Sequence, residues 1–66
     1  MEITVNGEPK AVPEGCTLRE LVGLLELDAS RVAVELDRVI VKAPLWSATV
    51  LRPGSKVGIV MFVGGG

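Results

Sequence analysis

A chain of 66 residues with a net charge of −1 forms one small domain, since a domain this size buries only about 60% of the surface that its unfolded chain exposes. Its scattered Lys and Arg residues and its single Phe and Trp provide neither a basic patch nor a stacking platform, which argues against nucleic-acid binding. The chain has no histidine and one cysteine, so we expect it to bind no metal. It also has few candidates for a general acid, base or nucleophile, so we expect it to be a partner of enzymes and not an enzyme.

The sequence contains no segment that predicts membrane association. The longest apolar stretch, residues 57–63, is far too short to cross a bilayer, and no apolar leader precedes a cleavage site at the N-terminus. Cys16 has no partner for an internal disulfide, and a free thiol suits a reducing compartment. We therefore expect a cytoplasmic protein without a membrane partner.

The N-terminal residues predict a β-hairpin. Residues 1–5 alternate apolar and polar side chains, which is the period of a half-buried strand. Asn6-Gly7 follows them and is a strong signal for a two-residue hairpin turn, with residues 10–12 as the return strand.

The next stretch predicts a helix from about Leu18 to Glu26. Thr17 and Glu20 have the spacing of a capping box, in which both side chains satisfy free backbone N–H groups at the start of a helix. Apolar side chains recur at positions i, i+3, i+4 and i+7, so one stripe of the helix must pack on another element. The stripe consists of Leu18, Leu21, Val22 and Leu25.

Further strands are predicted after the helix. Residues 32–36 alternate like a strand, and residues 39–41 follow across an Asp37-Arg38 turn. Pro44 then interrupts regular structure, before a candidate extended segment at residues 49–51.

Residues 57–63 are predicted to be the last strand, launched by a type II turn at Pro53-Gly54. This strand is apolar on both faces, so we place it in the middle of the sheet. We expect Val57 and Ile59 to face the helix, and Val60 and Phe62 to form an apolar docking patch on the uncovered face. A β-bulge near Met61 is the alternative, and it would bury Phe62 and expose Met61.

The order of hairpin, helix and further strands predicts an α+β fold of the β-grasp type. The sheet would be mixed, with four to five strands and one main helix on one face. The domain would span residues 1–63, and residues 64–66 would form a flexible glycine tail.

The three glycines of this tail are too costly to order and too small to pack as part of the core. Fully extended, they would carry the terminal carboxylate about 10 Å from the last anchored residue. With no Cβ atoms, such a tail fits a narrow channel in another protein. We interpret the chain as a carrier whose terminal carboxyl group is activated and loaded, although glycine-rich ends are also often simply disordered.

Four stretches in this order resemble the ThiS family of sulfur carriers in bacterial thiamine biosynthesis. They are residues 3–8, residues 32–36, Trp46 after a Pro-containing loop, and residues 62–66. The resemblance spans nearly the whole chain. It implies a ubiquitin-like β-grasp, because the wider group, similar in fold and tail, includes ubiquitin and the small subunit of molybdopterin synthase.

The resemblance also implies a mechanism and a set of partners. The Gly66 carboxylate would attack the α-phosphate of ATP within a ThiF-like adenylating enzyme, and sulfur from a cysteine desulfurase or a comparable source would then replace the adenylate. The thiocarboxylate on Gly66 would supply sulfur to a ThiG-like thiazole synthase, with Gly64 and Gly65 forming the slim approach to it. ATP would be used by the partner, so no cofactor would be bound by this chain.

Several alternatives stay open at this point. The same features suit a sulfur carrier for molybdopterin or another pathway, a ubiquitin-like modifier joined to lysines, or a passive β-grasp interaction module. Cys16 is interpreted as a small buried side chain in preference to a sulfur-transfer thiol. Trp46 is interpreted as a core residue in preference to a partner hot spot.

Overall fold

The computed structural model describes residues 1–62 of the chain. Along the chain the elements are β1 (Glu2–Val5), β2 (Glu8–Ala11), α1 (Leu18–Leu24), the 3-10 helix η1 (Ala29–Arg31), β3 (Val32–Leu36), β4 (Val39–Val41), the 3-10 helix η2 (Ala43–Ala48) and β5 (Lys56–Met61). The strands form one sheet in the order β2-β1-β5-β3-β4, in which β1 and β5 are parallel and the other pairs are antiparallel. The predicted α+β fold with a mixed sheet and one main helix is confirmed.

The helix α1 begins as its capping box predicts. The Glu20 N–H donates to the Thr17 hydroxyl at 3.1 Å, and the Thr17 N–H donates to the Glu20 carboxylate at 3.1 Å. The helix ends at Leu24, however, two residues before the predicted end. Glu26 adopts a left-handed conformation with φ of 57°, which reverses the chain in the manner of a glycine at a helix C-terminus.

Two tight turns join β1 to β2 and β3 to β4. Asn6 and Gly7 have φ angles of 51° and 82°, so both residues are left-handed, as a type I′ turn requires. Asp37 and Arg38 adopt the same conformation, with φ angles of 48° and 71°. Both predicted hairpins are therefore confirmed, the second one without glycine.

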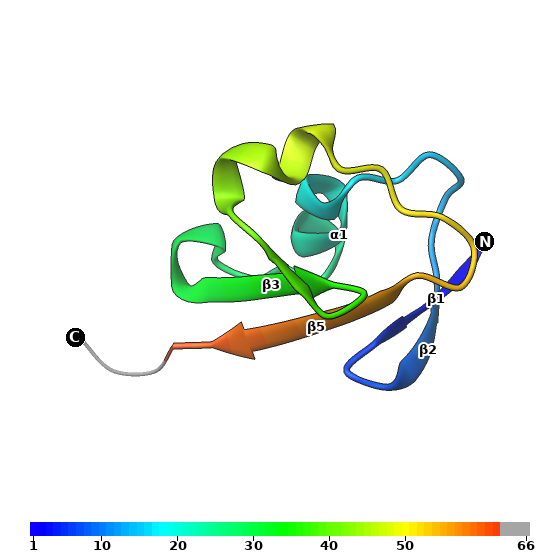
Figure 1. Ribbon diagram of the computed structural model, residues 1–66, viewed down its shortest axis with the longest axis horizontal. Coiled ribbons are helices and arrows are strands. Elements are labelled where there is room, and N and C mark those ends of the chain that lie inside the picture. Colours follow the sequence, from blue (N-terminus) through cyan, green and yellow to red (C-terminus); the bar gives the residue numbers. More distant parts are fainter. Residues whose placement is uncertain (63–66) are drawn as a thin grey trace.

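The core lies between the sheet and the helical segments, which Figure 1 shows on one side of the sheet. Its largest fully buried side chains come from the strands, α1 and η2, and each contributes about 1.5–3 kcal/mol by leaving water. They are Ile3, Leu18, Leu21, Val22, Val34 and Trp46.

The segment between β4 and β5 differs from the prediction of interrupted and extended structure. Six of its residues form η2, which begins around Pro44, where a missing N–H is tolerated. Trp46 lies within η2, only 2% exposed, and its Nε1–H donates to the Val41 carbonyl at 2.7 Å. Its predicted place in the core is confirmed. Val50 makes a single bridge to Thr17 and is not part of a strand.

The strand β5 is central, as predicted, with β1 on one side and β3 on the other (Figure 1). Its inner face packs against the core, whereas Val60 on its outer face is 62% exposed. The apolar residues of the outer face are therefore not explained by burial within the described chain.

Candidate functional site

The terminal glycines Gly64, Gly65 and Gly66 lie outside the described residues, and so does the domain boundary predicted after residue 63. Their roles stay predictions. The neighbouring part of the site can be described up to Phe62, whose N–H donates to the Arg31 carbonyl at 2.8 Å. This hydrogen bond fixes Phe62 beside η1.

The two faces of β5 carry different side chains. Val57 and Ile59 are 3% and 8% exposed and point into the core, while Val60 points to the opposite face. The ladder between β5 and β3 is continuous from Val57 to Met61, so the bulge considered as an alternative is absent from the described strand. The alternation derived from the sequence is confirmed, but a docking role for the exposed residues stays a prediction.

The predicted docking residues Val60 and Phe62 lie in different surroundings. Val60 borders a groove on the outer face of the sheet, which we call the outer groove. Its lining comes from residues 33–35 of β3, residues 58–60 of β5, Asn6 and Ile40. Phe62 is 59% exposed and borders a second groove, together with Leu27 and Met61 at the end of β5. The combination of these two exposed residues into one docking patch stays a prediction.

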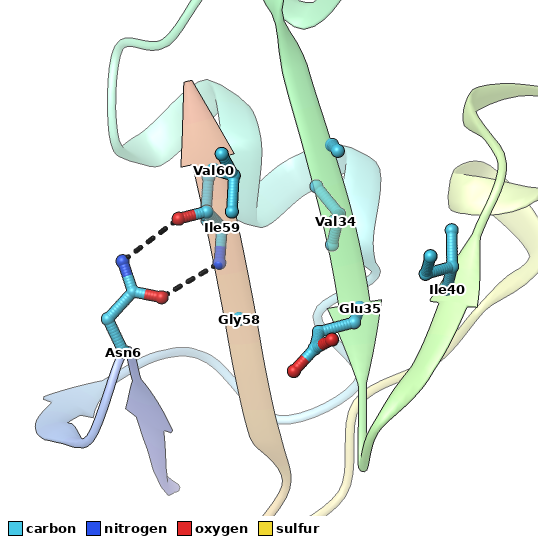
Figure 2. Close-up of a pocket in the computed structure, with 8 residues that line it drawn as sticks. Asn6, Val34, Glu35, Ile40, Gly58, Ile59 and Val60 are labelled. Atoms are coloured by element: carbon cyan, nitrogen blue, oxygen red, sulfur yellow. Dashed lines mark hydrogen bonds between the residues drawn. The ribbon is translucent and has the colours of Figure 1, made fainter. Parts of the chain in front are cut away.

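The side chain of Asn6 extends the sheet beyond the end of β1. Its Oδ1 accepts a hydrogen bond from the Ile59 N–H at 2.8 Å, and its Nδ2–H donates to the Ile59 carbonyl at 3.1 Å (Figure 2). The Asn6 N–H also donates to the Val57 carbonyl at 2.8 Å, so the amide group continues the parallel ladder where the backbone turns away. Asparagine meets both demands, because it tolerates a left-handed φ and offers a donor and an acceptor.

Asp37 plays a similar part on the other side of β5. Its backbone N–H donates to the Lys56 carbonyl at 2.8 Å, and its carboxylate accepts from the Lys56 N–H at 3.0 Å. The first residue of each tight turn therefore anchors the central strand through a side chain. Neither contact was predicted from the sequence, although an Asn or Asp at the first position of a two-residue turn is the type of residue that makes such bonds.

Cys16 is buried at 3% exposure next to the start of α1, which confirms its interpretation as a core side chain. Its Sγ–H donates to the Thr17 carbonyl at 3.4 Å. Burial raises the pKa of the Cys16 thiol, and the negative charge of Glu20 raises it further. A buried thiol with a raised pKa is a poor nucleophile, so Cys16 is not suited to sulfur transfer in the described fold.

The described residues, 1–62, contain no group of three or more metal-ligating His, Cys, Asp or Glu side chains. None of the helices in this part of the chain is long and apolar enough to span a membrane. What the described site offers is therefore a surface, made of the outer groove and the exposed end of β5.

Comparison with known proteins identifies related sequences over the full length of the chain. A family model described as the ThiS family matches residues 3–66. The chain is 35% identical over 66 residues to a protein of Paramagnetospirillum magneticum named thiazole synthase, and this match covers all of the chain but 20% of that protein. It is 33% identical to the uncharacterized protein ycf40 of Pyropia yezoensis, covering 93% of that protein.

The fold is similar to that of a solved structure with comparable sequence identity. The crystal structure of the thiamine biosynthesis protein ThiS from Geobacter metallireducens superimposes with a TM-score of 0.86 at 35% identity, and the match covers 100% of both chains. A solution structure of a thiamine biosynthesis protein from the same organism gives a TM-score of 0.83, again at 35% identity, and covers 88% of that chain.

Proposed function

Because this chain belongs to the ThiS family, we propose that it is a sulfur carrier protein of thiamine biosynthesis. The observation that carries the proposal is the extent of the family match, which runs through the domain and includes all three terminal glycines up to Gly66. The solved thiamine biosynthesis protein ThiS supports it, because it is similar to this chain over its whole length.

The proposed reaction begins with the terminal carboxylate. A carboxylate with an ordinary pKa near 3.5 is ionised at neutral pH and is an oxygen nucleophile. In the adenylating partner, this oxygen of Gly66 would attack the α-phosphate of ATP and release pyrophosphate. The outer sulfur of a persulfide on the sulfur donor would then attack the acyl carbon and displace AMP. A thiol acting as the two-electron reductant would cleave the resulting S–S bond, which leaves the thiocarboxylate on Gly66 and a disulfide between that thiol and the donor. Gly64 and Gly65 would form the narrow approach to the reacting carbon.

The proposed partners are a ThiF-like adenylating enzyme, a cysteine desulfurase or comparable sulfur source, and a ThiG-like thiazole synthase. The last of these is supported by the relative named thiazole synthase, in which a segment similar to this chain occupies one fifth of the polypeptide. A carrier joined to the enzyme in one protein is consistent with a carrier that meets the enzyme as a separate chain in another. Such a chain would act in the cytoplasm, where its partners and ATP are present.

Within this proposal, the exposed residues at the end of β5 would dock the partners. Val60 and Phe62 are more than half exposed, and both lie directly before the terminal residues along the chain. Contact at this position would hold the carrier while its last residue reacts.

The proposal is tested by deleting Gly66. The shortened chain should keep its fold by circular dichroism, because the hydrophobic core is built from residues between Ile3 and Ile59. It should lose ATP–pyrophosphate exchange with the adenylating enzyme, because it ends one residue short of the reacting carbon. Exchange at the rate of the full chain would contradict the proposal.

A second measurement separates a sulfur carrier from a modifier or a passive module. The intact mass of the protein purified from its native cell should show replacement of one oxygen atom by sulfur. Complementation of a strain that requires thiamine and lacks its own carrier should also succeed. Rescue of a molybdopterin-synthase mutant instead would assign the chain to the other pathway.

A further inference from the structure

The outer groove has an acidic side chain at its centre and apolar side chains around it. Glu35 extends from β3 over Gly58 of β5, with Ile40 and Val60 on the two flanking positions (Figure 2). In the register of the sheet, Glu35 lies opposite both Ile40 and Gly58, and Val60 lies opposite Ala33 in the next row. Ile40 and Val60 are 72% and 62% exposed.

The position of the Glu35 side chain depends on the missing side chain of Gly58. A Cβ atom built on Gly58 would lie 2.7 Å from Glu35 Cγ and 2.8 Å from its Oε1, closer than real Cβ atoms approach other atoms. Glu35 therefore lies across the strand, in the space that any larger residue at position 58 would fill. Its exposed side chain therefore lies across the outer groove rather than beside it.

The carboxylate of Glu35 is free for an outside partner. Among residues 1–62, the only salt bridge joins Arg31 to Asp28, and no side-chain hydrogen bond involves Glu35. A wholly apolar partner that covered Ile40 and Val60 would also remove water from this carboxylate, which is costly without a compensating charge. A long basic side chain avoids this cost, because its aliphatic part packs on apolar surface while its charged end reaches the acid.

We propose that the outer groove binds an arginine or lysine side chain from a partner protein, with the charged end paired to Glu35 and the aliphatic part against Ile40 and Val60. This assignment rests on the proposed function, because it specifies the chemistry by which an enzyme partner recognises the carrier. Val60 then acts as an apolar wall of the site, and Glu35 selects partners that present a positive charge.

The proposal is tested by measuring binding of the full chain to the adenylating enzyme and to the thiazole synthase of the same organism by calorimetry. Glu35→Gln keeps the shape of the side chain and removes its charge, and it should raise the Kd for at least one of the two enzymes about tenfold. The Kd of this variant should also depend less on ionic strength than that of the unaltered chain.

Two further variants complete the test. Glu2→Gln is the matched control, because Glu2 is an exposed glutamate on the neighbouring strand β1, outside the groove. It should leave the Kd within about twofold of the unaltered chain, as expected for a charge that the partner does not contact. Gly58→Ala keeps the charge of Glu35 but displaces its side chain, so it should also weaken binding.

The outcomes distinguish this inference from the proposed function. If the unaltered chain binds the enzymes and Glu35→Gln binds equally well, the groove assignment is wrong while the carrier function stands. Equal weakening by Glu2→Gln and Glu35→Gln would indicate general attraction by negative charge, and would also overturn the assignment. If the unaltered chain binds neither enzyme, the proposed function fails and the groove assignment fails with it.

Discussion

Val57 and Val60 are the same residue type on the same strand, three positions apart, and the fold uses them in opposite ways. Val57 is 3% exposed and contributes to the core under the helices, whereas Val60 is 62% exposed on the face without helices. The comparison teaches that the apolar character of β5 has two separate origins. One face is apolar because the domain must fold, and the other face is apolar without any requirement from the described core.

The largest effect is expected from placing the same charge on the two faces. Val57→Asp would bury an unpaired carboxylate in a core of this size, and should reduce the free energy of unfolding by about 4 kcal/mol or more. Val60→Asp should change it by about 1 kcal/mol, which is the span of strand preferences at exposed positions. Urea unfolding of both variants measures the difference.

Val60→Asp should nevertheless weaken binding to the adenylating enzyme or to the thiazole synthase, because it removes an apolar wall of the outer groove and puts in its place a charge that must lose water when a partner covers it. Calorimetry with the folded variant checks this. A folded Val60→Asp chain that binds both enzymes normally would show that the outer face is not a docking surface.

A smaller effect is expected at Asn6, whose side chain bonds to the backbone of β5 within the plane of the sheet and not to either face. Asn6→Gly keeps the left-handed turn but removes both hydrogen bonds to Ile59, so the free energy of unfolding should fall by about 1–2 kcal/mol. Amide hydrogen exchange at Ile59 should become faster. Asn6→Asp is the control, since it retains the acceptor alone. Its free energy of unfolding should lie between those of the unaltered chain and Asn6→Gly.

A still smaller change, and in the opposite direction, is expected on the far side of the core. Gly23 lies on the exposed side of α1, and a Cβ atom there would meet nothing within 4 Å. Gly23→Ala should therefore raise the free energy of unfolding by about 0.5–1 kcal/mol through helix propensity. Binding to the partners should stay unchanged, because the substitution lies on the opposite side of the sheet from the outer groove; weaker binding would mean that the partners also contact the helix.

The smallest effect at neutral pH is expected from Cys16, on the core side of the sheet. Its folded pKa is raised, so the folded state retains the thiol proton at pH values where the unfolded chain loses it. The resulting stability is fully present below the unfolded pKa, near 8.5, and is lost as the pH rises through the folded pKa. Unfolding curves from pH 7 to 10 should show a steeper alkaline decline for the unaltered chain than for Cys16→Ala; parallel declines would contradict the shift.

The elements predicted from the sequence were those with short-range causes. The Thr17 and Glu20 capping box, the Asn6-Gly7 turn and the alternation along β5 each depend on residues a few positions apart, and all three are confirmed. The end of α1 was wrong because Glu26 adopts a left-handed conformation that its residue type does not favour.

The features of the site that could not be predicted depend on contacts between distant segments. Asn6 pairs with Ile59 across 53 positions of sequence, and no local pattern indicates that a turn residue will bond to the last strand. Similarly, the placement of Glu35 over Gly58 follows from the register of β3 on β5, which is known only once the sheet is assembled. The sequence therefore predicted the exposed Val60 but not the acid beside it.

The central place of the last strand has a consequence for how the molecule is made. The pair β1 and β2 and the pair β3 and β4 do not touch in the sheet order, because β5 lies between them. During synthesis both hairpins can form early, but neither half can close the core until residues 56–61 have left the ribosome. A chain interrupted before β5 would thus leave its core open to water and to proteases. Only chains that have been synthesised as far as residues 56–61 can complete the fold.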